Sequence, residues 1–274
     1  VTGRRDDGYH ELDSVFLPVT LADRVTVEVR SASESAVTAR CNLAALPADE
    51  RNLAVRAARA FLAEYRITAQ VGVELEKAIP MGAGLGGGSS DAGAVLRMLG
   101  AMTRIPVDAR LQKLALSLGA DVPFFLAPAP ARVRGVGERI APLGGVPRFP
   151  LVIAVPQVEV ATAAVYRNLK PVQWSGPAPD AAETAIQERR LTQALAVNDL
   201  AEPAIAMFPQ IEQLRSMLAE QGAAVAQMSG SGGAVFGIFD QPQSAHRAAA
   251  ELRERVRDTT VLTCETLASG ERPG

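Results

Sequence analysis

The residues best suited to chemistry are concentrated in one glycine-rich stretch, residues 79–91, with the sequence IPMGAGLGGGSSD. Five of its residues are glycine, and apolar residues at helical spacing follow it. Glycine lets the backbone adopt positive φ and come close to a ligand, and the free N–H groups at a helix start attract anions. The stretch therefore predicts a phosphate cradle. Ser89 and Ser90 could either cap the helix or contact a phosphate oxygen or a magnesium ion.

Better-known glycine motifs fit this stretch less well. A P-loop requires Lys followed by Ser or Thr, whereas Gly88 is followed by two serines and the loop contains no Lys. The spacing G-x-G-x-x-G occurs at residues 82–87, but the acidic residue expected about 20 positions later would be Asp108, which is better interpreted as a helix N-cap. A flexible linker is disfavoured because Pro80 and an amphipathic helix bound the loop.

Three other positions carry candidate side chains. Asp121 lies between a helix exit and an apolar Val-Pro-Phe-Phe segment, where a carboxylate can accept or orient a hydroxyl proton, although a turn residue would look the same. Tyr9 and His10 follow an Asp-Gly turn signal, and His10 taken alone is better interpreted as structural. Residues 229–233 form a second small-residue loop, which a simple hairpin would explain almost as well.

Size and composition describe an ordinary globular protein. The chain has 274 residues, 48% hydrophobic and 21% charged, with a net charge of −2, enough for one large or two ordinary domains. Such a charge predicts neither a nucleic-acid partner nor a membrane partner, and we expect neither a membrane span nor a signal peptide. Cys41 and Cys264 suggest no disulfide or metal site, which favours a cytoplasmic protein. Because the chain starts at Val1 rather than Met, we expect residues upstream of it.

Hydrophobic periodicity predicts an alternation of strands and helices. In the first half we expect strands at 14–17, 25–29 and 71–75. Helices should start after Asn52, Asp91 and Asp108, and the last of these should end at Gly119. The pattern of residues 36–46 is too mixed to assign. The Pro- and Gly-rich stretch 141–150 predicts a boundary between a domain at 1–145 and another at 146–274. In the second half we expect strands at 151–155, 225–228 and 261–266 and helices at 189–196, from 205 to Gly222, and at 244–256. Two strand–helix–strand passages there suggest a ferredoxin-like α+β layer.

Four separated pieces of the chain resemble one family. Residues 3–12 (GRRDDGYHEL), 80–92, 119–125 (GADVPFF) and 229–232 together look like the GHMP kinases. The Gly-Tyr-His piece is typical of one branch of that family, the kinases of 4-diphosphocytidyl-2-C-methyl-D-erythritol. The resemblance implies an α+β fold of two domains: an N-terminal α/β domain like domain 2 of ribosomal protein S5, and a C-terminal ferredoxin-like α+β domain.

The resemblance also implies an activity and a role for each matching residue. The expected reaction is ATP-dependent phosphorylation, with Mg²⁺, of the 2-hydroxyl of a CDP-linked substrate in the non-mevalonate isoprenoid pathway, with Asp121 as the catalytic carboxylate. The expected ATP-binding residues are Asn52, Pro80, Gly82, Gly84, Leu85, Gly86, Gly87, Gly88, Ser89 and Ser90. Tyr9 and His10 would read the cytosine, and Tyr166 would stack on it. Thr162, Asn198, Gly230, Ser231 and Gly232 would line the rest of the site, and Asp121 would also contact the substrate. The family also uses a Lys, near an Asn, on a strand that would precede Val1.

Two alternatives remain open at this point. Another GHMP kinase, acting on homoserine or on a mevalonate-type alcohol, would use Tyr9 and His10 for packing only. A nucleotide-binding protein without turnover would bind ATP and release no ADP.

Overall fold

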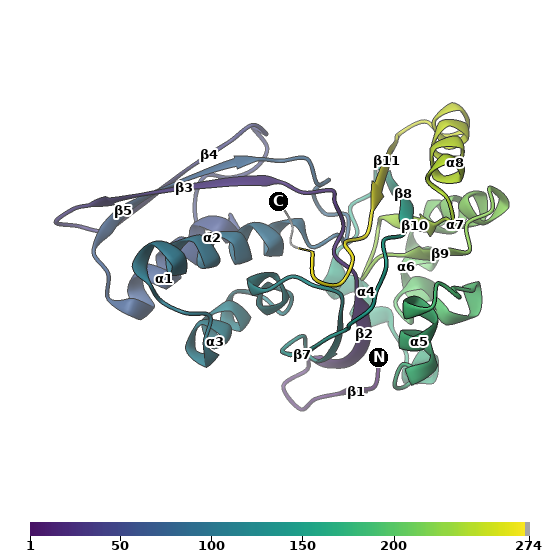
Figure 1. Ribbon diagram of the computed structural model, residues 1–274, viewed down its shortest axis with the longest axis horizontal. Coiled ribbons are helices and arrows are strands. Elements are labelled where there is room, and N and C mark those ends of the chain that lie inside the picture. Colours follow the sequence, from purple (N-terminus) through teal and green to yellow (C-terminus); the bar gives the residue numbers. More distant parts are fainter. Residues whose placement is uncertain (272–274) are drawn as a thin grey trace.

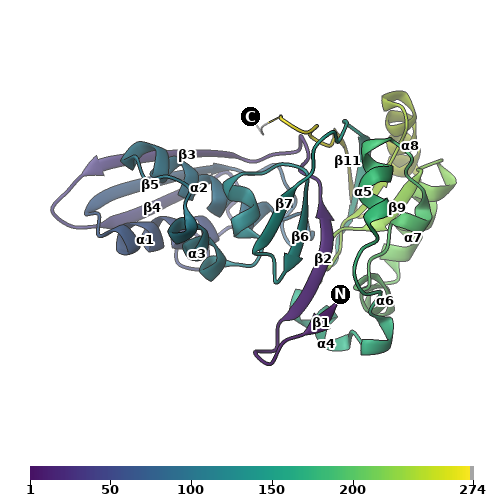
Figure 2. The ribbon, with the colours of Figure 1, turned by 60° about the horizontal axis from the view of Figure 1, so that its bottom comes forward.

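A computed structural model describes residues 1–271 as three sheets with helices packed on them (Figure 1). The molecule is elongated. The sheet formed by β3, β4 and β5 lies at one end, the sheet formed by β8 to β11 lies at the other, and β2 runs between them (Figures 1 and 2). Within residues 1–271, none of the helices combines the length and the apolar character needed to cross a bilayer.

The first sheet carries the strand that leads into the glycine-rich stretch. Its order is β3 (Arg24–Ser31), β5 (Ala69–Glu76), β4 (Ala36–Cys41), with β5 antiparallel to β3 and parallel to β4. Every second residue of β5 is buried, as expected for a strand with one covered face. That face packs on α1 (Leu53–Tyr65) and α2 (Gly87–Thr103). The glycine stretch therefore connects a buried strand to a buried helix.

Two further elements of this half are the third helix and the edge strand of the sheet. The third helix, α3 (Ala109–Leu118), begins as predicted, because the Asp108 carboxylate accepts a 2.9 Å hydrogen bond from the Leu111 N–H. Gly119 ends it with an extended backbone, φ 175°, rather than the left-handed conformation of a C′ glycine. The strand β4, which the sequence left unassigned, lies at the sheet edge and buries none of its side chains fully.

The central sheet has the order β1 (Gly3–Arg4), β2 (His10–Phe16), β6 (Ala131–Gly135), β7 (Arg139–Pro142) and is antiparallel throughout. The predicted turn at Asp7-Gly8 is confirmed: Gly8 has φ +88°, and the hairpin that it closes places Arg4 opposite His10. A short 3₁₀ helix, η1 (Val122–Leu126), connects α3 to this sheet.

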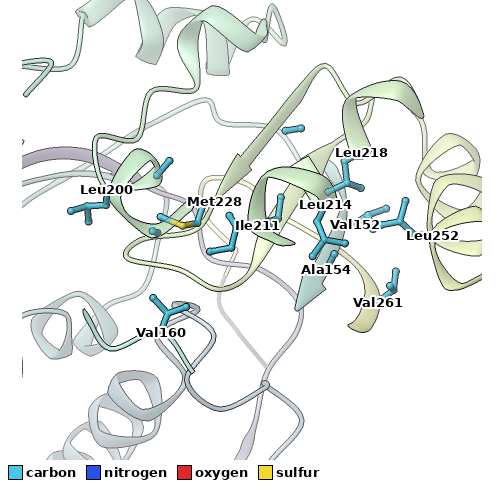
Figure 3. Packing of buried hydrophobic residues seen from close by; sticks show 14 of the residues in the cluster. Val152, Ala154, Val160, Leu200, Ile211, Leu214, Leu218, Met228, Leu252 and Val261 are labelled. Carbon is cyan, nitrogen blue, oxygen red and sulfur yellow. The ribbon is translucent and has the colours of Figure 1, made fainter. Parts of the chain in front are cut away.

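The third sheet is ferredoxin-like, as predicted. Its spatial order is β11 (Thr259–Glu265), β8 (Pro150–Pro156), β10 (Val235–Ile238), β9 (Val225–Met228), with helical segments after β8 and after β10, which is the split β-α-β arrangement. Ile211, Leu214 and Leu218 from α7 pack against Val152 and Ala154 from β8 in the core of this half (Figure 3). The helical segments are α4 (Thr162–Asn168), η2 (Pro171–Gln173), α5 (Asp180–Gln187), η3 (Gln193–Leu195), α6 (Ala201–Met207), α7 (Gln210–Glu220) and α8 (Pro242–Arg255).

Two helix predictions in this half are wrong. The helix expected at 189–196 lies earlier, as α5, and ends before Arg189, whose φ of +57° is left-handed and cannot continue a right-handed helix. The single helix expected from 205 to Gly222 is two helices, α6 and α7, separated at Phe208-Pro209. Proline has no N–H to donate and disfavours helical geometry in the residue before it.

Contacts join the central sheet and the segment before β3 to the C-terminal half. Arg132 on β6 donates to both oxygens of Asp13 on β2, at 2.7 and 2.8 Å, and also to Asp180 and Glu183 on α5 at 2.5 and 2.8 Å. The segment before β3 pairs with the end of β11 through a bridge between Val19 and Thr266. The domain boundary at residue 145 stays a prediction.

Candidate active site

The glycine-rich stretch forms a loop that passes directly into α2. The helix starts at Gly87, after Gly86 with φ +71°, and no side chain caps it. The expectation that Ser89 or Ser90 caps the helix is therefore wrong: both lie inside the first turn, and the Ser90 hydroxyl donates to the Gly87 carbonyl at 2.8 Å. Because the first N–H groups of a helix have no acceptor within it, the amides of 87–89 can bind an anion.

The second small-residue loop, residues 229–233, interlocks with the first. The Ala234 N–H donates to the Ala83 carbonyl, and the Ser229 hydroxyl donates to the Gly84 carbonyl, both at 2.9 Å. Gly84 has φ +72°, and a Cβ there would lie 2.6 Å from the carbonyl oxygens of Ser229 and Gly232. Gly84 is thus required by the close approach of two backbones that are far apart in the sequence.

Two further predicted residues, Thr162 and Asn198, lie against this second loop. The Asn198 amide donates to the carbonyls of Met228 and Gly230 at 3.0 and 2.9 Å, and the hydroxyls of Thr162 and Ser231 share a hydrogen bond of 2.7 Å. Thr162 opens α4, so this contact connects the loop to the helix that carries Tyr166. The structure therefore brings Thr162, Asn198 and 230–232 together.

The segment that follows Asp121 packs on the helix that begins at the glycine loop. Asp121 immediately precedes η1, and Phe125 of η1 packs against Gly93 of α2 and against Gly86, the residue before that helix. A Cβ on Gly93 would lie 2.5 Å from the Phe125 Cβ, and one on Gly86 would lie 3.0 Å from its ring. Arg97 of α2 adds a 2.6 Å hydrogen bond to the Phe125 carbonyl. Phe125, four residues after Asp121, thus packs directly on the start of α2.

The Asp121 side chain is open to solvent yet surrounded by protein. This partial burial raises the pKa of its carboxyl above the usual 3.8, because a charged group is less well solvated there. Burial also raises the pKa of Tyr166 to about 12, with the charge of Asp121 as a second cause. Asp121 therefore lies close enough to Tyr166 for its charge to act on the phenol.

The predicted base-reading residues form an aromatic cluster. The His10 ring stacks on Tyr166 with centroids 5.0 Å apart, and it is nearly perpendicular to the Trp174 ring, whose centroid lies 6.1 Å away. Burial and the nearby Arg4 guanidinium lower the pKa of His10 below 6.5. Tyr9 lies on the adjoining turn and is 62% exposed. Sequence reasoning missed Trp174, although it is the only tryptophan in the chain.

Comparison with known proteins identifies the family. Residues 52–128 match the GHMP kinases N terminal domain, and residues 182–258 match the GHMP kinases C terminal domain. The 4-diphosphocytidyl-2-C-methyl-D-erythritol kinase of Thermus thermophilus is 42% identical over 252 residues, covering 91% of this chain and 86% of the relative. This chain belongs to that kinase family. Its counterpart in Anaeromyxobacter dehalogenans is 41% identical over 258 residues, covering 92% and 80% of the two chains.

Solved structures agree with this assignment. A crystal structure of 4-(cytidine 5'-diphospho)-2C-methyl-D-erythritol kinase, 40% identical, superposes on this GHMP kinase with a TM-score of 0.81, covering 99% of this chain and 95% of the other. A homoserine kinase from Cytophaga hutchinsonii, 16% identical, gives a TM-score of 0.73 with 95% and 96% of the chains covered; at that identity the likeness shows the fold alone. The chain is thus an ATP-dependent small-molecule kinase.

Asn52 occupies a structural position in this GHMP kinase. Its side chain is buried, accepts from the Ala54 N–H at 3.0 Å as the N-cap of α1, and donates to the Pro47 carbonyl at 3.0 Å. Both ends of the amide are therefore engaged, and its contact with adenine stays a prediction.

The remaining predicted ATP-binding residues flank the loop. Pro80 and Leu85 are half-buried, and Gly82 is exposed with φ +67°. A pocket of about 390 Å³ opens beside this part of the loop, bordered by Met81, Gly82 and Ala83 on one side and by Gly233 and the end of β8 on the other. Both glycine loops thus border one open space. Contacts of the loop residues with ATP stay predictions.

Proposed function

We propose that this kinase transfers the terminal phosphoryl group of ATP to the 2-hydroxyl of 4-diphosphocytidyl-2-C-methyl-D-erythritol, giving the 2-phosphate and ADP. The observation that carries the proposal is the aromatic cluster of His10, Tyr166 and Trp174. The cluster offers ring faces on which a nucleobase can stack, and it includes a tyrosine on which the charge of Asp121 acts. The named relatives, at about 40% identity over most of the chain, support the same substrate.

The phosphate side would act through position and charge. Phosphoryl transfer needs little covalent chemistry from the protein, so catalysis consists mainly of orienting the groups and neutralising charge. The free amides of residues 87–89 and the positive end of the α2 dipole suit the triphosphate. Asp121 would orient the 2-hydroxyl and accept its proton, and the raised pKa of its carboxyl makes it a better acceptor near neutral pH.

Magnesium fits the donors present without a dedicated protein cage. No group of three or more His, Cys, Asp or Glu side chains within residues 1–271 could hold a metal. Nucleotide-bound Mg²⁺ usually takes one or two protein oxygens and fills its other positions with phosphates and water. Asp121 and the Ser89 hydroxyl are oxygen donors suited to that role. The ion would neutralise charge on the phosphates.

The aromatic side would hold the CDP group. Tyr9 and Tyr166 offer ring faces on which a nucleobase can stack. A neutral imidazole has one donor and one acceptor nitrogen, and the lowered pKa of His10 favours that neutral form. Thr162 and Ser231, hydrogen-bonded to each other at the start of α4, would face the remainder of the substrate. Thr162, Tyr166 and the loop 230–232 would then contact the substrate directly.

We also propose a cytoplasmic enzyme without nucleic-acid or membrane partners. Both cysteines are free thiols, as is usual in a reducing compartment, and the net charge of −2 gives no basic surface for a polyanion.

A substrate comparison tests the proposal. ADP release is followed by a coupled assay with ATP and Mg²⁺ and, in separate reactions, the CDP-linked substrate, homoserine, mevalonate or no acceptor. We expect ADP only with the CDP-linked substrate, and ³¹P NMR should show a new phosphate monoester at its 2-position. Turnover of homoserine or mevalonate instead would assign another GHMP kinase activity, and ATP binding without ADP release from any acceptor would indicate a nucleotide-binding protein.

A further inference from the structure

Three charged side chains are buried directly beneath the glycine loop. Asp23, Lys77 and Asp91 expose only 1%, 4% and 4% of their side chains. The Lys77 ammonium donates to Asp23 and, at 2.6 Å, to Asp91. We call these three residues the loop brace.

Asp23 fixes the entry to the loop. The oxygen that does not contact Lys77 accepts hydrogen bonds from the N–H groups of Ala78 and Ile79 at 2.6 and 2.8 Å. These residues immediately precede Pro80 and the glycines. The backbone of Lys77 is held as well, because the Asn42 side chain accepts from its N–H at 2.8 Å and donates to its carbonyl at 3.3 Å.

Asp91 connects the brace to the exit of the loop. It lies one turn into α2, and a Cβ built on Gly87, the first residue of that helix, would lie 3.5 Å from the Lys77 ammonium nitrogen and 3.0 Å from Ile79. The brace therefore spans the base of the loop, linking the residues before it to the helix turn that carries its free amides.

Stability alone does not account for three buried charges. Burial raises the pKa of Asp91 to about 6, even though Lys77 acts in the opposite direction, and its second oxygen is buried without a hydrogen-bond partner in the described part of the chain. Burial lowers the pKa of Lys77, but the hydrogen bonds to Asp23 and Asp91 outweigh this and raise it overall. Replacing buried ion pairs by apolar side chains of similar volume is often neutral or stabilising. An apolar cluster could fill the same space, but it could not make the directional hydrogen bonds with which the brace holds the backbone before the loop.

We propose that Asp23, Lys77 and Asp91 are positioning residues, which hold the amides of 87–89 in the arrangement that binds the triphosphate of ATP. This inference rests on the proposed role of the glycine loop in binding ATP. The brace would act through the backbone, since its side chains lie beneath the loop.

The first test is Asp91→Asn, which keeps the size of the side chain and removes its charge. We expect the Kd for ATP, measured by titration without any acceptor, and the KM for ATP to rise about tenfold, the loss expected for one charge-assisted hydrogen bond. The KM for the acceptor should stay within about twofold, because the aromatic cluster is separate from the brace. The matched control is Asp13→Asn, which disturbs the buried Arg132 cluster away from the loop; it should lower Tm and leave ATP affinity unchanged.

A charge-free variant separates positioning from stability. In Asp23→Asn/Lys77→Met/Asp91→Leu, the asparagine oxygen can still accept from Ala78 and Ile79, and the other two side chains pack as an apolar pair. We expect Tm to recover relative to Asp91→Asn while the Kd for ATP remains raised. If ATP affinity recovers together with Tm, or if Asp91→Asn binds ATP like the wild type, the brace only stabilises the fold and the inference is overturned. A wild-type protein that binds no ATP would instead contradict the proposed function.

Discussion

The two sides of the candidate site are built from different parts of the protein. On the phosphate side, which we define as residues 82–90 with the loop 229–233, the groups suited to a ligand are backbone amides, and two glycine loops pack backbone against backbone. We define the base side as Tyr9, His10, Tyr166 and Trp174. There the groups suited to a ligand are aromatic side chains, which come from a turn, a strand, a helix and a loop.

This difference has consequences for tolerance to mutation. A backbone site depends on the absence of side chains, because a single Cβ at Gly84 meets two carbonyl oxygens. A side-chain site can exchange one ring for another and lose only part of its contact area. We therefore expect changes on the phosphate side to affect ATP and the fold together, and changes on the base side to affect one substrate.

The largest effect is expected between the two sides, at Asp121. Asp121→Asn is nearly isosteric but cannot accept the hydroxyl proton, so kcat should fall by roughly 10²- to 10⁴-fold, the usual contribution of a positioned acid or base. Both KM values should change little, as steady-state kinetics with each substrate varied would show. Normal turnover by this variant would remove Asp121 from the mechanism.

The pH profile of the same pair of proteins sharpens this prediction. The pKa of the Asp121 carboxyl is raised above 3.8, and the carboxylate must be ionised to accept a proton. Wild-type kcat/KM should therefore fall as pH decreases through this raised pKa, whereas the residual activity of Asp121→Asn should lack that acid limb.

The next largest effect is expected from a methyl group in the phosphate side. Gly84→Ala combines a backbone clash with a left-handed φ of +72°, so it should lower the free energy of unfolding by about 1–3 kcal/mol and weaken ATP binding. Denaturant unfolding and ATP titration measure the two effects.

Gly88→Ala is the matched variant. A Cβ on Gly88 has no neighbour within 4 Å in the described residues, and alanine favours helix by about 0.5–1 kcal/mol over glycine. We expect unchanged or higher stability together with weaker ATP binding, since the methyl group would occupy the space proposed for phosphate. Unchanged ATP affinity in Gly88→Ala would place the phosphates elsewhere.

A smaller and more selective effect is expected on the base side. Tyr166→Leu removes a ring face, so the KM for the CDP-linked substrate should rise about tenfold, within the 1–3 kcal/mol typical of a base stacked on an aromatic ring. The KM for ATP should not change. Tyr166→Phe keeps the ring and should behave like the wild type; if both variants leave the KM unchanged, Tyr166 does not contact the base.

The same contrast explains what the sequence could predict. On the phosphate side, residues 82–90 are one contiguous stretch whose glycine content reports its backbone conformation, so a loop suited to phosphate could be predicted from composition and spacing. The strands β3 and β5 beside it were also predicted within a few residues. The helix start at Gly87 was missed because glycine is a poor cue for a helix interior, and the two serines suggested a cap. The interlocking with residues 229–233 depends on tertiary packing, and the loop alone resembled an ordinary hairpin.

The side-chain clusters show where sequence reasoning stops. Trp174 lies in a Pro-rich segment without periodicity, and only the fold brings it to His10. Lys77 and Asp91 are 14 residues apart and Asp23 is 54 residues from Lys77, so no local pattern relates them. The Arg132 cluster likewise joins residues up to 119 positions apart. Charged side chains are usually exposed, and nothing in the sequence marks these as buried.

The smallest expected effect concerns the charge of His10. Burial and Arg4, its partner across the β1–β2 hairpin, lower the pKa of His10, so NMR titration of its ring protons, assigned with His10→Gln, should give a midpoint below 6.5. Because the folded-state pKa is depressed, the stabilising contribution is complete above the unfolded-state value of about 6.5 and is lost as pH falls through the lower folded-state value. Arg4→Gln removes the second cause and should move the midpoint upward, while the Kd for ATP stays constant because Arg4 lies on the base side. If the midpoint does not move in Arg4→Gln, the Arg4 charge does not lower the pKa of His10, and burial, the larger cause, is left as the main reason that the imidazole stays neutral.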